Sequence, residues 1–458
     1  MSTSLSANLL GRLHPSRQPW ITRQSYHHEL VNCFAFPVAI SLIEGTVIGV
    51  LAKKTFHVGP WMFATLMAVP MLANVSSYLW ARALRGRRKV RSITLIQIGL
   101  LASVASIGLL PTNAYGPILL IGLVAIAKVL QTGLITARST VWRYNYPRAV
   151  RARIVGRLSV IANTAIGIAP LAGYAVVDYH PQSFRIIYPL GVGISIIGVI
   201  WYSRVRLRGE RALLRFERER DARPSPHGTP GPIYEYDPND TGSFWSVLKK
   251  DHFFRRYMKW QFMAGLAAMM SEVIVIWMIV DLTGGFRHPF LISIALGVAL
   301  PMISTITTMP AWARMLDRVH VTRVRYYQGL VITVVQLLYW IGAAIGSLSV
   351  FAVARVVLGG FRGAGILAWQ LGHNDFADRR FVAVYMGIHV TLTGVRGAAA
   401  PFVAMMLYKG PVSLPDWLGM PAHDGVSHHA MLIIAAMSLI AAVGQRHLAR
   451  RIARSEAR

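Results

Sequence analysis

Cysteine and charged residues are scarce in this sequence. The 458 residues include a single cysteine, Cys33, and one thiol excludes both a disulfide framework and a cysteine-rich metal site. Charged residues make up only 15% of the chain, whereas hydrophobic residues make up 54%. Soluble domains typically contain about 25% charged residues. The composition therefore excludes an ordinary soluble protein and makes lipid the main solvent of the chain.

Motifs for catalysis and for nucleotide binding are also missing. The sequence contains no phosphate-binding P-loop, no nucleophile elbow and no zinc-binding spacing. His423, His428 and His429 lie close together, but no carboxylate accompanies them at the spacing of a known metal site. We therefore expect a protein that is not an enzyme, that has no cofactor and no metal, and that draws its energy from a gradient.

Long apolar runs separated by short charged connections fill most of the chain. A helix needs about 20 mostly apolar residues to cross a bilayer. The runs predict an all-α polytopic membrane protein with twelve transmembrane helices in two six-helix bundles. Almost no polar residue separates two spans between 331 and 372, so we place a tight turn at 346–349. The predicted spans are 32–52, 60–81, 93–111, 117–137, 158–178, 186–204, 258–282, 290–311, 327–348, 350–371, 382–407 and 428–446.

Polar segments divide these spans into two sets. Charged residues and prolines are concentrated between the sixth and seventh spans, which indicates a solvated linker. The end of this linker, 244–250, mixes aromatic residues with lysines, and it is either an interfacial helix or a plain loop. The start of the chain has arginines but no apolar core of signal-peptide type, so we read it as a tail. The predicted order is N-terminal tail, first six-helix bundle, linker, second six-helix bundle and basic tail, at 1–31, 32–204, 205–257, 258–446 and 447–458.

The distribution of basic residues predicts the orientation. A formal net charge of +29 would suggest nucleic acid as the partner of a soluble protein, but here the charges lie between apolar runs. Lysines and arginines concentrate in the connections that follow even-numbered spans, and such loops stay on the cytoplasmic side. We therefore expect a multi-pass protein of the cytoplasmic (inner) membrane with both termini cytoplasmic. Anionic lipid headgroups, not nucleic acid, are the expected partner of these arginines.

Short internal matches at nearly the same offset indicate that the chain is a duplication. Four pairs occupy equivalent places in the two sets of spans. They are Trp80-Ala-Arg-Ala-Leu84 with Trp312-Ala-Arg-Met-Leu316, Ala169-Pro170 with Ala400-Pro401, Lys128–Gly133 with Arg355–Gly360, and Glu44 with Glu272.

With two six-span halves and a basic linker, the sequence resembles the major facilitator superfamily over essentially its whole length. The loop between spans 2 and 3 in that family reads roughly G-x-x-x-D-[RK]-x-G-[RK]-[RK]. This chain keeps the second glycine and the basic residues after it, but an arginine stands at the acidic position, and the second-half copy lacks the glycines. The resemblance implies cytoplasmic gate loops, and the contact that closes them either depends on the acid of the second copy or is rebuilt from other residues. The residues concerned are Arg85, Gly86, Arg87, Arg88, Asp317 and Arg318.

Two further segments resemble motifs of that family. The span-4 signature, R-x-x-x-x-G, appears as Lys128 to Gly133 with lysine in place of arginine. Span 5 keeps Gly167, Ala169-Pro170 and Gly173, which is similar to the G-P-x-x-G motif of antiporters. The second likeness favours export as the direction of transport.

Glu44 and Glu272 are the acidic residues that fall well inside predicted spans. A charge at membrane depth costs a few kcal/mol, so it indicates a functional role. The duplication relates the two residues, and the resemblance places them on helices that line the central cavity. A carboxylate removed from water binds a proton more readily, and we expect both residues to couple transport to protons. The alternative is that each is tied to a basic neighbour for helix packing.

Basic residues inside the spans have two interpretations. Arg355 and Arg362 lie seven residues apart and therefore on one helical face. Together with Lys128 and Arg396, these arginines can bind an anionic substrate, or they can neutralise Glu44 and Glu272 as ion pairs. In span 11, His389 shares a polar face with Arg396 and is either a proton relay or a hydrogen-bonding partner of the next helix. The four cations are Lys128, Arg355, Arg362 and Arg396.

The sequence thus predicts a monomeric secondary transporter of a small molecule that works by alternating access. We expect it to be proton-coupled and to export amphiphilic or cationic compounds. A proton-linked importer of an anionic metabolite is the first alternative. A lipid flippase or a non-transporting membrane sensor is an alternative of another class, because a fold does not fix a function.

Overall fold

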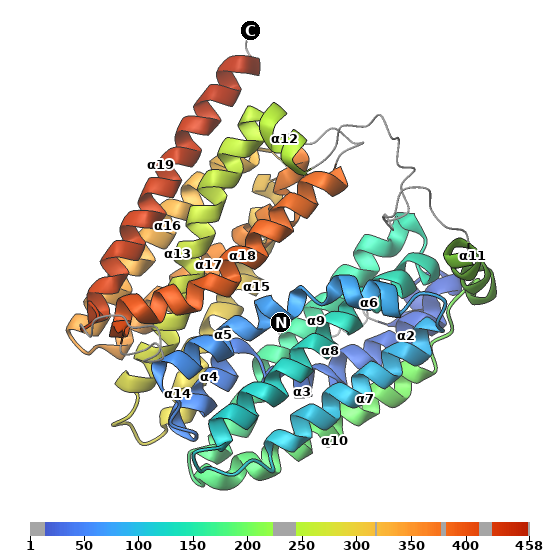
Figure 1. Cartoon of the computed structure of the whole chain (residues 1–458), viewed down its shortest axis with the longest axis horizontal. Coiled ribbons are helices and arrows are strands. Elements are labelled where there is room, and N and C mark those ends of the chain that lie inside the picture. The colour runs from blue at the N-terminus through green and yellow to red at the C-terminus, as the bar shows by residue number, and fades with distance from the viewer. Residues whose placement is uncertain (1–13, 223–243, 317, 377–381, 412–423, 457–458) are drawn as a thin grey trace, which may run out of the picture. The chain divides into compact units, whose positions relative to one another are not determined.

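The computed structural model describes residues 14–222, 244–316, 318–376, 382–411 and 424–456, and all regular elements in these ranges are helical (Figure 1). Eleven of the helices are long and apolar enough to cross a membrane. This confirms the predicted all-α polytopic membrane fold.

The chain divides into two compact units. As far as the structure describes them, the first comprises Met1–Ile48 and Ala73–Pro230, and the second comprises Gly49–Leu72 and Gly231–Arg458. The second unit therefore includes a short segment from the first half of the sequence, 49–72. This segment holds the end of the first span and most of the second.

The first unit is built from long helices that pack along their lengths. Contacts join α7 to α8 and to α10, α10 to α2, and α2 to α9. Its helices are α2 (Trp20–Ala35), α3 (Pro37–Leu42), the start of α4 (Gly45–Lys54), α6 (Ser77–Ala83), α7 (Lys89–Ile107), α8 (Gly116–Asn145), α9 (Arg148–Val177), α10 (Phe184–Ser203) and α11 (Glu210–Ala222), with 3₁₀ turns at Pro15–Arg17 and Pro181–Ser183.

The second unit has the same kind of packing. Contacts join α16 to α19 and α17, α15 to α17, and α13 to α18 and α19. Its helices are the end of α4, most of α5 (Pro60–Asn74), α12 (Phe244–Lys250), α13 (His252–Leu282), α14 (Pro289–Ile294), α15 (Leu300–Leu316), α16 (Val321–Ala344), α17 (Leu348–Leu371), α18 (Val382–Lys409) and α19 (Ala430–Glu456). A π-helical turn, Ala295–Ala299, joins α14 to α15, and 3₁₀ turns lie at Gly372–Asp375 and Ser427–His429.

The first span differs from its predicted bounds in two ways. It begins at Trp20, not at residue 32, so residues 20–31, which we assigned to the tail, form the start of the helix. Hydropathy misses this part because its buried residues, Thr22 and Glu29 among them, are polar. The span is also interrupted, because Ile43 and Glu44 separate α3 from α4.

The second predicted span, 60–81, is divided as well. A turn at residues 75–76 separates α5 from α6, and Pro70 lies inside α5. A proline inside a helix removes a backbone donor and distorts the turn before it. With 15 and 7 residues, neither piece is among the eleven long helices.

The predicted turn between the ninth and tenth spans is confirmed. Helix α16 ends at Ala344, and α17 begins at Leu348. Gly346 has a φ of 65°, in the left-handed region that favours glycine. The Ser347 side chain accepts a hydrogen bond from the Val350 N–H and caps α17. In the predicted linker, 244–250 is helical, and its location at the membrane interface stays a prediction.

Candidate functional site

Glu44 lies at the interruption of the first span, between α3 and α4. Lys128, in the middle of α8, donates a hydrogen bond from Nζ to Glu44 Oε1 at 2.9 Å. The Lys128 side chain is 6% exposed, whereas the Glu44 side chain is 37% exposed. The carboxylate is thus the accessible member of this ion pair.

Two buried tyrosines fix the interruption. The Tyr188 hydroxyl donates to the Leu42 carbonyl at 2.9 Å, and the Tyr174 hydroxyl donates to the Val47 carbonyl at 3.3 Å. Both side chains are buried. A break in a helix is stable where other groups bind the freed backbone atoms. The position of Glu44 is therefore set by packing within the first unit.

A second ion pair joins Glu272 on α13 to Arg355 on α17. Arg355 donates from its two terminal nitrogens to the two carboxylate oxygens, at 3.0 and 3.1 Å. The Arg355 side chain is fully buried, and the Glu272 side chain is 40% exposed. A bidentate arginine–carboxylate pair is stronger and more directional than a single hydrogen bond.

Arg355 also binds the π-helical turn that precedes α15. Its Nε donates to the Leu296 carbonyl at 2.9 Å, and a terminal nitrogen donates to the Gly297 carbonyl. A π-helical turn leaves backbone carbonyls without their usual partners and is often found at functional sites. One guanidinium therefore fixes three elements of the second unit around Glu272.

The two ion pairs have the same plan. In each, a partly exposed carboxylate lies on the first span of one sequence half, and a buried cation lies on the fourth. The sequence matches Glu44 with Glu272 and Lys128 with Arg355 are thus also matches in structure. Of the two interpretations of the basic residues, ion pairing is what Lys128 and Arg355 show.

A second equivalence involves the two matching tryptophans. Trp80 Nε1 donates to the Val129 carbonyl on α8 at 2.9 Å, and Trp312 Nε1 donates to the Gly360 carbonyl on α17 at 2.6 Å. Each tryptophan thus ties the end of the second span of its sequence half to the fourth span. Two independent equivalences support the predicted duplication.

The other predicted residues are held by different contacts or are exposed. Arg396 on α18 is buried and donates to the Gln261 carbonyl at 2.6 Å and to Thr393 Oγ1 at 3.2 Å. His389 is also buried, and its ring packs edge-on against Trp369 with centroids 5.6 Å apart. Arg362, seven residues after the buried Arg355, is exposed.

Sequence reasoning missed Glu29, which is fully buried in α2. It accepts hydrogen bonds from Trp142 Nε1 at 2.6 Å and from the Tyr146 hydroxyl at 2.8 Å, and Arg138 Nε lies 3.7 Å away. Burial, and next the charge of Glu29, hold the pKa of Tyr146 well above its ordinary value, so its hydroxyl remains a donor. Glu29 was missed because it precedes the apolar run that marked the predicted first span.

The family model of the Major Facilitator Superfamily matches residues 32–401. The chain belongs to this superfamily. It is therefore a secondary transporter of small molecules and not an enzyme. No curated protein is detectably similar to it in sequence.

Solved structures share the fold at low sequence identity. The nucleoside transporter NupG is 12% identical over 94% of this chain and 99% of its own, with a TM-score of 0.62. A POT family transporter in complex with 5-aminolevulinic acid is 9% identical over 93% and 96%, with a TM-score of 0.67. A D-xylose-proton symporter is 10% identical over 93% and 96%, with a TM-score of 0.61. At these identities the likeness concerns the fold alone.

The loop after α6 departs from the superfamily motif at Arg85, and an acid from elsewhere binds the loop. Glu217 on α11 accepts hydrogen bonds from the Gly86 N–H and from Lys89 Nζ, both at 2.7 Å. Arg87 and Arg88 are exposed beside it. Glu217 was missed because it lies in the charged linker, where a solvated helix is the usual expectation. In the corresponding second-half loop Arg318 is exposed, and Asp317 lies outside the described residues.

Within the second unit, the end of α4 is bound to α13. Lys53 Nζ donates to Asp281 Oδ1 at 2.5 Å and to the Trp277 carbonyl at 3.0 Å, and it lies 3.8 Å from the centroid of the Trp277 ring. Lys54 Nζ donates to Thr283 Oγ1 at 2.9 Å. The segment 49–72 is thus held by specific polar contacts as well as by apolar packing.

The histidines near α19 make aromatic contacts. The rings of His428 and His429 lie 4.2 Å apart, and Trp340 Nε1 donates to His429 Nδ1 at 3.2 Å. His423 lies outside the described residues. Within the described ranges, no group of three or more histidine, cysteine, aspartate or glutamate residues is placed to hold a metal ion.

Proposed function

We propose that this transporter exports small amphiphilic or cationic compounds in exchange for protons, and that Glu44 and Glu272 bind the coupling protons. We further propose that it resides in the cytoplasmic membrane with both termini in the cytoplasm, as the basic loops indicate.

The arrangement of the two ion pairs carries the proposal. In both, the carboxylate is 37–40% exposed and the cation is 0–6% exposed. A proton or a cationic ligand that reaches either pair therefore meets the carboxylate first. Protonation removes the negative charge and leaves a buried cation without its counter-charge, which is costly in a poorly solvated site. Proton binding is thereby linked to rearrangement of the helices that hold the pair.

The same geometry favours a cationic cargo. A cation competes with Lys128 or Arg355 for an exposed carboxylate, whereas an anion has to displace a carboxylate from a buried cation. Protons and cationic cargo would also compete with each other for Glu44 and Glu272. Two ligands that exclude each other from one site are exchanged across the membrane and not carried together. Exchange against inward-moving protons gives export, in agreement with the antiporter-like Ala169-Pro170 segment in α9.

The interruptions of the helices support the location of the site. Transporter sites are typically built where membrane helices are discontinuous. Glu44 lies at such a break, and Arg355 binds the carbonyls of a π-helical turn. Each ion pair therefore has an irregular backbone segment beside it that can change conformation when the pair opens.

One observation favours a second candidate function, the import of an anionic metabolite. Arg362 is exposed on α17, two turns beyond Arg355. An anion could bind there without opening either ion pair. In this case binding of the cargo would depend on Arg362 and not on the two glutamates.

A thermal-shift screen separates these candidates. Purified protein is screened against cationic amphiphiles and anionic metabolites at two pH values, together with the variants Glu44→Gln, Glu272→Gln and Arg362→Gln. A ligand that binds the folded state raises the melting temperature. Our proposal predicts stabilisation by cations that weakens at the lower pH and is lost in a glutamate variant but kept in Arg362→Gln. Stabilisation by anions that survives both glutamate variants and is lost in Arg362→Gln would contradict a cationic cargo and support the anion-binding candidate instead.

Transport itself is then measured in proteoliposomes with a trapped pH-sensitive dye. When a stabilising cation is added to vesicles with a proton gradient, protons should cross the membrane in the direction opposite to the cation. Glu44→Gln and Glu272→Gln should abolish this proton movement, and Arg362→Gln should not. Movement of cargo and protons in the same direction would contradict the exchange mechanism.

A further inference from the structure

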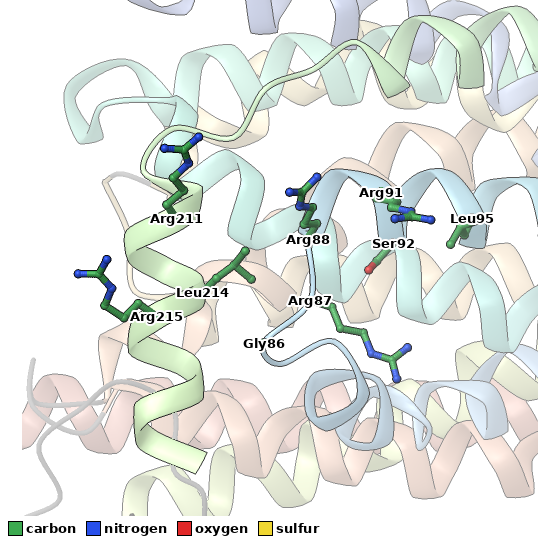
Figure 2. Close-up of a pocket in the computed structure, with 9 residues that line it drawn as sticks. All are labelled: Gly86, Arg87, Arg88, Arg91, Ser92, Leu95, Arg211, Leu214 and Arg215. Atoms are coloured by element: carbon green, nitrogen blue, oxygen red, sulfur yellow. The ribbon is translucent and has the colours of Figure 1, made fainter. Parts of the chain in front are cut away.

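A cavity of about 770 Å³ lies in the first unit, between the loop that precedes α7 and the linker helix α11. Five arginines from these two segments line it, as Figure 2 shows. Two of them are on α11 and the others are on the loop and on the first turn of α7. They are Arg87, Arg88, Arg91, Arg211 and Arg215.

The cavity brings five positive charges together. All five arginine side chains are exposed, and among the described residues no ion pair joins any of them to an acid. Glu217 is already bound to Lys89 and to the Gly86 N–H. Like charges held together repel one another, so an anion that bridges them stabilises the arrangement.

The protein holds the two walls of the cavity together. The Glu217 carboxylate joins α11 to the loop through two hydrogen bonds of 2.7 Å. Lys89, whose side chain is 5% exposed, also donates to the Leu84 carbonyl at 2.6 Å. Gly86 has a φ of 63°, which lets the loop turn sharply there. Arginines from segments more than 100 residues apart are thereby gathered at one place by a fixed framework.

The ligand chemistry follows from the guanidinium groups. Arginine binds phosphate oxygens through two parallel N–H donors, and this makes it the preferred residue for phosphate recognition. The Ser92 hydroxyl lines the same cavity and adds a further donor. A group with several phosphate oxygens can contact arginines of both walls at once.

The cavity also has an apolar edge. Leu214 extends from α11 toward the loop, and Leu95 lies one turn further along α7 than Arg91 (Figure 2). Leu95 is 60% exposed on a helix apolar enough to cross a membrane. A lipid places its phosphate beside such a helix end and its acyl chains along the helix.

We propose that this cavity is a phosphate-binding site, occupied by the headgroup of an anionic lipid. A soluble phosphate compound shares the same chemistry, and the experiment distinguishes the two sources. The site is separate from the glutamates of the proposed function, so either proposal can fail without the other.

The second unit offers a matched control. A smaller cavity beside the equivalent loop is lined by two arginines among the described residues, Arg314 and Arg318. The double variant Arg88→Gln/Arg211→Gln removes one charge from each wall of the first cavity. Arg314→Gln/Arg318→Gln removes the same number of charges at the equivalent place in the second unit.

Binding is measured with the purified full-length protein by following its thermal stabilisation. The probes are cardiolipin in phosphatidylcholine vesicles, phosphatidylcholine vesicles alone, and soluble pyrophosphate. We expect cardiolipin to stabilise the wild type, with an apparent affinity about thirtyfold lower in Arg88→Gln/Arg211→Gln because each lost arginine removes roughly 1 kcal/mol of attraction to an anionic surface. The control variant should bind cardiolipin like the wild type.

The remaining outcomes decide the source or reject the site. Stabilisation by pyrophosphate that matches that by cardiolipin, and that is lost in Arg88→Gln/Arg211→Gln alone, overturns the lipid assignment in favour of a soluble phosphate compound. Equal effects of cardiolipin on both double variants overturn the site altogether. Equal stabilisation of the wild type by phosphatidylcholine vesicles with and without cardiolipin does so as well.

Discussion

Arg355 binds both oxygens of Glu272 and, with its remaining donors, the carbonyls of Leu296 and Gly297. An arginine side chain stays charged in proteins. The buried charge of Arg355 therefore depends on Glu272 at all times. In the equivalent pair, the described contact between Lys128 and Glu44 is one hydrogen bond of 2.9 Å.

This difference predicts unequal effects of two equivalent substitutions. Removing one partner of a buried ion pair costs about 3–5 kcal/mol. We expect Glu272→Gln to approach this cost, because the Arg355 charge stays uncompensated. Glu44→Gln should cost less, because it replaces one hydrogen bond to Lys128 and not a bidentate pair. Thermal unfolding of the two variants and the wild type in one detergent checks this order.

The third variant, Lys128→Met, is the control for this prediction. It leaves the carboxylate of Glu44, which is 37% exposed, and a partly solvated carboxylate is tolerated better than a buried cation. Its melting temperature should lie above that of Glu272→Gln. Equal melting temperatures for Glu44→Gln and Glu272→Gln would show that the two pairs contribute alike and that the identity of the cation is immaterial.

Hydropathy was sufficient to predict most of the fold. A continuous apolar run is the sequence signature of a membrane helix, and the break between α16 and α17 was predicted from glycine and serine within an apolar stretch. Ion pairing of Glu44 and Glu272 with basic residues was one of two predicted alternatives, because a buried charge needs a counter-charge. The choice between pairing and anion binding required three-dimensional positions.

Polar contacts between distant segments were harder to predict. Glu29 and Glu217 lie in charged segments, where solvent exposure is the usual reading, yet Glu29 is fully buried and Glu217 holds a loop. Their partners, Trp142 and Lys89 among others, are more than 100 residues away in the sequence. A pattern within one segment contains no information about such contacts.

Lys53 and Asp281 should contribute unequally to stability even though they bind each other. The Asp281 side chain is 53% exposed, and an exposed ion pair is worth about 0–1 kcal/mol. Lys53 also binds the Trp277 carbonyl and lies over its ring, a contact worth about 0.5–2 kcal/mol. We expect Lys53→Ala to lower the melting temperature clearly more than Asp281→Asn. A reversed order would mean that the ion pair, and not the contact with Trp277, makes the larger contribution of Lys53 to stability.

Gly133 is required for the close approach of α8 to Trp80. A Cβ at this position would lie 2.6 Å from the indole ring, and the ring is fixed by its hydrogen bond to Val129. Overpacking of this kind costs about 1–3 kcal/mol, so Gly133→Ala should lower the free energy of unfolding. Gly122→Ala on the same helix is the control, because nothing lies within 4 Å of its added Cβ.

A second substitution tests the cause of this effect. Trp80→Phe makes the ring smaller and removes the hydrogen bond that fixes it, so Gly133→Ala should cost less in the Trp80→Phe background than in the wild type. Additive effects of the two substitutions, or an equal loss in Gly122→Ala, would contradict a clash with Trp80. Chemical unfolding followed by intrinsic fluorescence measures all four variants.

Cys33 should report the unfolding of the first unit. It is the sole cysteine of the 458 residues, its side chain is 3% exposed, and Arg138 donates to its sulfur at 3.5 Å. A buried thiol cannot reach a reagent, so a fluorogenic maleimide should label the protein only as the first unit opens.

The neighbouring ion pair provides the test of this reporter. Glu29→Gln removes the charge that balances the buried Arg138, and an uncompensated buried charge destabilises its surroundings by several kcal/mol. Labelling of Cys33 should then begin at a lower temperature than in the wild type. Arg362→Gln changes an exposed residue of the second unit and should leave the onset unchanged. Rapid labelling of the wild type well below its melting temperature would contradict the burial of Cys33 and with it the packing of α2 against α9 and α10.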